Sequence, residues 1–204
     1  QLAKTQSDID FCYSALAKVS RSFSVVIKQL PDNLRDDVCI FYLVLRALDT
    51  IEDDMRFPYE KRMPLLKSFH EKCEDESFFL EDVGDQQDYI DLLANYPKVT
   101  KVFNSLTPGA KDIIKDITKR MGEGMAHFAT EDVITNKDFD LYCHYVAGLV
   151  GIGLSKLFAN SGVEDKEMMH LEELSNSMGL FLQKTNIIRD YHEDLHSDRV
   201  FLPK

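Results

Sequence analysis

The sequence predicts an all-α protein, folded as one domain over residues 1–204. Strand signals are nearly absent, because apolar and polar residues seldom alternate with a period of two and no Asn-Gly or Asp-Gly hairpin turn occurs. Apolar residues recur instead with helical spacing through most of the chain. A length of 204 residues, with 44% of them hydrophobic, is enough to bury one sizeable core.

In the first half of the chain, prolines and capping residues mark the expected helix ends. Asp32 follows Pro31 and is an expected N-cap, and Pro58 should end the helix that follows near Phe57. Pro97 should close a later, shorter helix. We expect helices over residues 9–19, 32–57, 59–73 and 89–96, and a loop over residues 74–88.

In the second half, two pairs of residues have the chemistry of helix starts. Thr107 and Pro108 suit the N-cap and first turn of a helix. Thr135 is followed three residues later by Asp138, which is the spacing of a capping box, and residues 160–162 should end that helix. We expect helices over residues 108–128, 135–158 and 164–196.

Composition excludes several classes of function. The net charge is -11 and no basic patch dominates, which argues against a nucleic-acid partner. The four cysteines contain no C-x-x-C pair, so we expect reduced thiols rather than disulfides or a zinc site. The longest uncharged run, residues 143–155, is shorter than the roughly 20 residues of a membrane span, and no signal peptide is visible, so we expect this chain to be soluble.

Two acidic segments, residues 49–54 and 190–194, dominate the candidate chemistry. Each sets two aspartates four residues apart, hence on one helical face, with a glutamate just before the second aspartate. The first segment follows residues 38–45, which are apolar on every side as in a buried helix, and it falls at the helix end where the macrodipole disfavours anions. Such acids suggest a Mg²⁺ site for a diphosphate between two helices, and the alternative is a solvated helical face.

Two polar stripes extend these segments along their helices. One aligns a tyrosine and an arginine with the first pair of aspartates, and the other aligns two amides with the second pair. On otherwise apolar helices such stripes line a cavity, or alternatively form a buried hydrogen-bond network between the helices. The stripes are Tyr42, Arg46, Asp49 and Asp53, and Gln183, Asn186, Asp190 and Asp194.

Four arginines flank the same segments, and the planar guanidinium matches phosphate oxygens. Any one of them alone is more often a surface residue. They are Arg21, Arg46, Arg189 and Arg199.

Between the two acidic helices lies a run with three glycines, residues 142–153. Each glycine in a helix interior costs about 1 kcal/mol relative to alanine. The run therefore suggests close helix packing, or alternatively room for a long apolar ligand. We expect His144 in this run to be a hydrogen-bonded interior histidine rather than a metal ligand.

Four blocks carry a family resemblance: Ser20-Arg21-Ser22-Phe23 and residues 39–54, 142–153 and 178–194. On these blocks the chain resembles the squalene/phytoene synthase family of head-to-head prenyl transferases, and its squalene synthase branch more than its phytoene synthase branch. The resemblance implies an isoprenoid-synthase-type helical bundle that is truncated at its C-terminal end, with later helices absent.

The implied activity joins two molecules of farnesyl diphosphate to presqualene diphosphate, with Mg²⁺, and reduces this product to squalene with NADPH. The chain has no G-x-G-x-x-G fingerprint, so a nicotinamide cofactor would bind without a Rossmann unit. The alternatives are a phytoene or dehydrosqualene synthase, which stops before reduction, and a non-catalytic fragment that binds prenyl diphosphates. The resemblance also implies a monomer held by a C-terminal anchor at the cytosolic face of the endoplasmic reticulum.

The resemblance further implies roles for individual residues. The metal carboxylates would be Asp49, Glu52 and Asp53, with Asp190 and Asp194 opposite, and Tyr142 would be catalytic, in proton removal or carbocation handling. The NADPH phosphates would contact Arg21, Arg46 and Arg189. The substrate-binding residues would be Ser20, Arg21, Ser22, Phe23, Tyr42, Arg46, Gln183, Asn186, Arg189 and Arg199.

Overall fold

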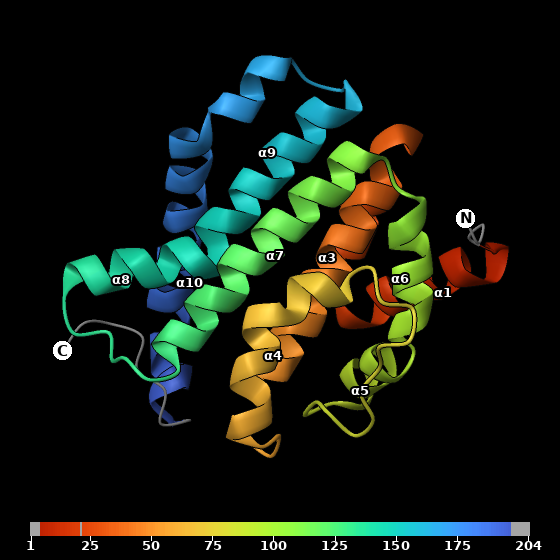
Figure 1. Cartoon of the computed structure of the whole chain (residues 1–204). Coiled ribbons are helices and arrows are strands. Elements are labelled where there is room, and N and C mark those ends of the chain that lie inside the picture. Colours follow the sequence, from red (N-terminus) through yellow and green to blue (C-terminus); the bar gives the residue numbers. More distant parts are fainter. Residues whose placement is uncertain (1–4, 21, 197–204) are drawn as a thin grey trace.

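The computed structural model describes residues 5–20 and 22–196, with the backbone alone for residues 192–196. Within these ranges the secondary structure is entirely helical, which confirms the predicted all-α class (Figure 1). The elements are α1 (Gln6–Val19), α2 (Phe23–Lys28), α3 (Asp32–Asp53), α4 (Tyr59–Lys72), α5 (Gln87–Ala94), α6 (Tyr96–Ser105), α7 (Pro108–Phe128), α8 (Asn136–Cys143), a π-helical turn η1 (His144–Gly148), α9 (Leu149–Ser161), a 3₁₀ turn η2 (Lys166–His170) and α10 (Glu172–His196).

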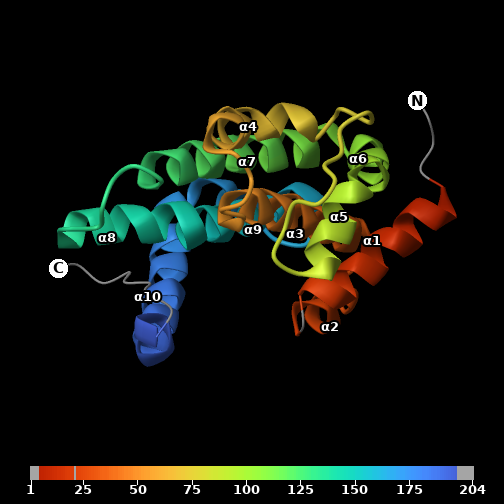
Figure 2. The same ribbon diagram turned by 90° about the horizontal axis from the view of Figure 1, so that it is seen from below.

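Helix α3 lies at the centre of the bundle, where it packs against α1, α4, α6, α7 and α9 (Figures 1 and 2). Neighbours on every side explain why residues 38–45 are apolar all round, and within that stretch only Tyr42 is not fully buried. The acids predicted as metal ligands thus lie at the end of a helix in the centre of the bundle.

Two predicted helix starts are confirmed by their hydrogen bonds. The Thr107 side chain accepts from the Ala110 N–H at the start of α7. Thr135 and Asp138 form a complete capping box at the start of α8. These caps satisfy backbone donors that the first helical turn leaves unpaired.

Helices α8 and α9 are continuous through η1 and form one helical run, Asn136–Ser161, of 26 residues. Among the described residues this run alone is long and apolar enough to cross a membrane by composition, with a mean hydropathy of 1.3. It packs against α3, α7 and α10, and 33% of its apolar window is buried.

The glycines of this run serve close packing. A Cβ on Gly151 would lie 2.6 Å from the carbonyl oxygen of Ser175 on α10, and one on Gly148 would meet the Asn176 side chain. Gly153 faces the core instead, where a Cβ would lie 2.4 Å from the Phe41 ring. Of the two interpretations of these glycines, close helix approach is the one these contacts support.

Over residues 172–191, where its side chains are described, helix α10 is packed on one side only. Ile187 is buried against Phe139 and Cys143, whereas apolar side chains on its other side are exposed, among them Phe181 at 64% and Ile188 at 68%.

Several predicted boundaries were wrong, each for a local reason. The expected helix 89–96 corresponds to α5, which ends at Ala94. Pro97 does not close it but lies in the first turn of the next helix, α6, where its missing N–H costs nothing. The expected helix 164–196 is interrupted at Leu171 between η2 and α10. The short α2 had not been predicted, and α3 ends at Asp53 rather than near Phe57.

The packing of α4 on α7 provides a stability prediction. A Cβ on Gly122 would lie 2.0 Å from the carbonyl oxygen of Leu66, and a backbone atom cannot move aside as a flexible side chain can. We expect Gly122→Ala to lower the free energy of unfolding by about 1–3 kcal/mol, despite the better helix propensity of alanine. Urea unfolding measures the change, with the exposed neighbour Glu123→Ala as control; equal stability of the two variants would contradict the packing described.

Candidate active site

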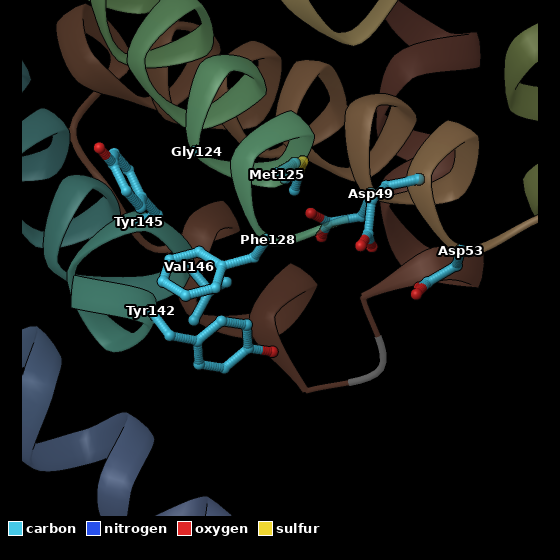
Figure 3. Close-up of a pocket in the computed structure, with 9 residues that line it drawn as sticks. Asp49, Asp53, Gly124, Met125, Phe128, Tyr142, Tyr145 and Val146 are labelled. Carbon is cyan, nitrogen blue, oxygen red and sulfur yellow. The ribbon is translucent and has the colours of Figure 1, made fainter. Parts of the chain in front are cut away.

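Three acids from the end of α3 open onto a cavity of about 220 Å³ (Figure 3). Helix α7 forms a second wall, and the end of α8 with η1 forms a third. The lining residues are Asp49, Glu52, Asp53, Gly124, Met125, Phe128, Tyr142, Tyr145 and Val146.

The acidic wall (Asp49, Glu52 and Asp53) faces the aromatic wall (Phe128, Tyr142 and Tyr145) across the cavity. Figure 3 shows the Tyr142 hydroxyl directed toward the side of the cavity where Asp49 and Asp53 lie. The Phe128 ring contacts the Tyr142 ring edge-to-face, with centroids 5.6 Å apart. Tyr145 lies against Gly124, where a Cβ would stand 2.2 Å from its ring. The cavity is therefore polar on one side and largely apolar and aromatic on the other.

The carboxylates of the acidic wall are held in an unfavourable place for anions. Burial raises the pKa of Asp49 to about 7, and the Asp53 carboxylate adds to this increase while Arg46 opposes it. Burial also raises the pKa of Glu52, as do the neighbouring charges of Asp53 and Asp49. No basic residue stands in the last turn of α3, whose macrodipole further disfavours negative charge. A cation in this cavity would relieve the repulsion.

Arg46 supplies part of that positive charge. Its guanidinium lies 3.7 Å from the Asp49 carboxylate and donates to the Tyr42 hydroxyl over 3.2 Å. It also sits 5.7 Å and 5.6 Å from the ring centroids of Tyr42 and Tyr89, in cation–π range of both. Its Nε is buried without a hydrogen-bond partner among the described residues. Arg46 is thus held in place with one donor still unsatisfied.

Burial and the nearby carboxylates, first that of Glu52, raise the pKa of Tyr142. The phenol therefore stays protonated at neutral pH and can donate a hydrogen bond. Its ring, in addition, can present a π face to a cation.

The acidic wall fits Mg²⁺ only together with a phosphate ligand. No three acidic, histidine or cysteine side chains come together as a metal cluster in the part of the chain that the structure describes. Magnesium, however, is commonly held by one or two carboxylates plus substrate phosphates, and retains several waters. Asp49 and Asp53, one helical turn apart, match that requirement.

In the second acidic segment, Asp190 has a described side chain, and it does not line this cavity. The Asp190 carboxylate accepts two hydrogen bonds from Arg189 of the same helix, both of 2.7 Å, and Arg189 lowers its pKa. Gln183 is half-buried and Asn186 is exposed on α10. The Asp194 side chain lies outside the described residues, so the convergence of the two segments stays a prediction.

Among the predicted substrate-binding residues 20–23, Phe23 lies close to the polar stripe of α3. Its ring is 5.9 Å from that of Tyr42, which contacts Arg46. The buried Ser20 hydroxyl donates to the Leu16 carbonyl, and Ser22 is exposed. Arg21 and Arg199 lie outside the described residues.

Asp54 has a structural role that was not predicted from the sequence. Its buried carboxylate accepts from the N–H groups of Gly84 (2.8 Å) and Arg56 (2.9 Å), and from the Arg56 guanidinium at 3.1 Å. Arg56 also donates to the Gly84 carbonyl over 2.5 Å. These bonds end α3 at Asp53 and fasten the loop before α5 to that end. A third consecutive acid, beyond the i and i+4 pair, was the available signal.

The sequence carries a signal for some of the other lining residues that were not predicted, but not for all of them. Tyr145 and Val146 follow Tyr142 at three and four residues, a spacing that places them on its helical face. Met125 and Phe128 on α7 had no such signal, because only the packing of α7 brings them to the cavity.

The Asp54 contacts predict a pH-dependent stability. Its hydrogen bonds to Arg56 lower the pKa of Asp54 to about 2, below its unfolded value near 4. The stabilisation, about 2 kcal/mol, is therefore present above pH 4 and is lost as the pH falls toward 2. We expect Asp54→Asn to lower the free energy of unfolding by about that amount at pH 7, and the difference from wild type to narrow between pH 4 and 2.

Urea unfolding of Asp54→Asn and wild type, at pH 7 and again between pH 4 and 2, measures this effect. Asp82→Asn, an exposed acid in the same loop, is the matched control and should change stability by less than about 0.5 kcal/mol. A loss in Asp54→Asn that does not depend on pH would contradict the ionic role of the carboxylate.

Comparisons with known proteins point to one family. A family model described as Squalene/phytoene synthase matches residues 16–204. The chain is 59% identical over 201 residues to squalene synthase BSS of Botryococcus braunii, covering 97% of this chain and 43% of that protein. It is 52% identical over 200 residues to lycopaoctaene synthase of the same organism, covering 96% and 45%. The chain thus spans less than half the length of these relatives.

A solved structure of TcSQS in complex with the ligand BPH1237 superposes with a TM-score of 0.93 at 50% identity. The match covers 97% of this chain and 58% of that one. The isoprenoid-synthase-type helical bundle expected from the sequence is thereby confirmed.

Proposed function

The chain belongs to the squalene/phytoene synthase family, and we propose that the protein joins two molecules of farnesyl diphosphate head to head. The product would be presqualene diphosphate, which the same protein would reduce to squalene with NADPH. The observation that carries the proposal is the pairing, in one cavity, of three carboxylates on α3 with Tyr142 and an apolar wall.

We assign the binding of the diphosphate to the acidic wall. Asp49 and Asp53 would hold Mg²⁺, with Glu52 between them in sequence and the second acidic segment, Asp190 and Asp194, as further ligands. When bound, Mg²⁺ would neutralise the charge of the departing diphosphate. Arg46, with its unsatisfied Nε, would add positive charge on the same side of the cavity.

The aromatic wall would stabilise the allylic cation that remains when the diphosphate leaves the substrate. The ring faces of Tyr142 and Phe128 can stabilise positive charge, each by about 0.5–2 kcal/mol. The protonated Tyr142 hydroxyl would donate a hydrogen bond in the direction of the acidic wall. Met125 and Val146 would exclude water, which would otherwise trap the cation as an alcohol.

The described residues do not by themselves form an assembled NADPH site. Arg46 on α3 and Arg189 on α10 pair with Asp49 and Asp190, and the third predicted phosphate ligand, Arg21, lies outside the described residues. The reductive half of the proposal therefore rests on the family likeness to squalene synthases. A location at the cytosolic face of the endoplasmic reticulum, through a C-terminal anchor, rests on the same likeness.

A second candidate is a related condensation with a different prenyl diphosphate or without reduction. The 52% identity to a lycopaoctaene synthase supports it, because this chain is similar to proteins with different named products, at 59% and 52% identity.

Product analysis separates these candidates. We expect the full-length protein to release diphosphate from farnesyl diphosphate only with Mg²⁺, and to form squalene only when NADPH is added. Hydrocarbon formed equally well without NADPH would favour a dehydrosqualene- or phytoene-type synthase. Binding of farnesyl diphosphate with no release of diphosphate would contradict an enzymatic function.

The raised pKa of Asp49 predicts opposite effects of Asp49→Asn on stability and on binding. A carboxyl group whose pKa is higher in the folded state destabilises that state increasingly as the pH rises from about 4 to about 7. We expect the metal-free variant to melt at a higher temperature than wild type at pH 8. Because 35% of the Asp49 side chain is exposed, water screens the effect. We therefore expect Asp49→Asn to raise the free energy of unfolding at pH 8 by only about 1–2 kcal/mol.

The same variant should lose most of its affinity for Mg²⁺ with inorganic diphosphate, measured by calorimetry. Asp116→Asn, an exposed acid on α7, serves as control and should bind normally. Unchanged binding by Asp49→Asn would refute the metal assignment, whatever the melting temperatures.

A further inference from the structure

The helical turn that follows Tyr142 is wound as a π-helix. It covers His144–Gly148, and the Leu149 N–H donates to the His144 carbonyl, five residues back. Single π turns inside α-helices are rare and often occur at functional sites. This one contributes Tyr145 and Val146 to the cavity, directly after the turn that contributes Tyr142. Part of the aromatic wall therefore stands on π-helical rather than α-helical backbone.

The other face of the same turn is fastened to α10 by a hydrogen bond. His144 Nδ1 lies 2.7 Å from Asn176 Oδ1, and both side chains are half-buried. Because the partner atom is an amide oxygen, Nδ1 carries the proton and donates. This bond fixes the imidazole ring, and with it the rotation of the backbone two residues after Tyr142.

Glycines bring the two backbones together at this bond. A Cβ on Gly148 would stand 1.9 Å from Asn176 Oδ1, so any larger residue would displace the amide. A Cβ on Gly179 would stand 2.5 Å from the Ala147 carbonyl oxygen. Apolar close packing tolerates small shifts along the helix, whereas a directional hydrogen bond between two half-buried side chains favours one arrangement. The register of α10 against η1 is thus set at this bond.

From this arrangement we infer that His144 and Asn176 are positioning residues for Tyr142. They hold η1 so that the Tyr142 hydroxyl faces the acidic wall, and they fix α10, which carries the second acidic segment, against the same turn. The inference deepens the proposed function, on which it rests for the role of Tyr142. Neither residue lines the cavity, and neither is assigned contact with substrate.

The test compares two cross-helix hydrogen bonds in the full-length protein. Asn176→Ala removes the bond to His144, and His144→Asn tests rescue because the asparagine amide nitrogen can occupy the place of Nδ1. Ser175→Ala is the matched control, since Ser175 precedes Asn176 on α10 and its hydroxyl bonds Ser155 on α9 over 2.7 Å. We expect Asn176→Ala to lower kcat for diphosphate release about tenfold, with KM for farnesyl diphosphate within about twofold.

The control and the rescue decide between positioning and general support of the fold. Ser175→Ala should keep its kcat, and His144→Asn should retain more of it than His144→Ala does. In a Tyr142→Phe background, Asn176→Ala should cause no further loss, because it acts through that tyrosine. Equal kcat losses in Asn176→Ala and Ser175→Ala, or fully additive losses with Tyr142→Phe, would overturn the inference.

A second measurement does not depend on turnover. With 3-fluorotyrosine at position 142, the ¹⁹F resonance should shift in Asn176→Ala and stay in place in Ser175→Ala. An unmoved resonance in Asn176→Ala would overturn the positioning role even in an active enzyme. A shifted resonance in a protein that releases no diphosphate would support the positioning role and contradict the proposed function instead.

Discussion

Negative charge at the end of a buried helix is the constraint on which the rest of the structure depends. Helix α3 packs against α1, α4, α6, α7 and α9, and its last two turns present Asp49, Glu52 and Asp53 to a small cavity. Burial and mutual repulsion raise the pKa values of Asp49 and Glu52, and the helix dipole acts in the same direction. Arg46 offsets only part of this charge. A fold that retains such a cluster is preorganised to receive a cation.

The surrounding elements can be understood as supports for this cluster. The bonds of Asp54 to Arg56 and Gly84 fix the point at which α3 ends, so the acids remain in its last turn. Gly122 lets α7 approach α4 closely. The π turn brings Tyr145 and Val146 to the opposite wall, beside Tyr142.

The fold class and the acidic wall could be predicted because both depend on local spacing. The Thr107 cap and the Thr135–Asp138 capping box lie within single turns, and Asp49 and Asp53 share a face through helix geometry alone. Pro97 was misleading, since proline suits a helix start as well as a helix end. The α7 wall and the Asp54–Gly84 contact could not be predicted, because residues far apart in sequence form them. The place of Asp190 and Asp194 relative to the cavity stays a prediction.

The central claim is that the carboxylates of α3 bind a divalent cation together with a diphosphate. Anomalous diffraction from crystals grown with Mn²⁺ and inorganic diphosphate tests it most directly, because the manganese signal locates the ion independently of any assay. We expect a manganese peak bonded to a carboxylate oxygen of Asp49 or Asp53, with diphosphate oxygens completing the site. Manganese found only at other acidic residues, with diphosphate present and these carboxylates free, would contradict it.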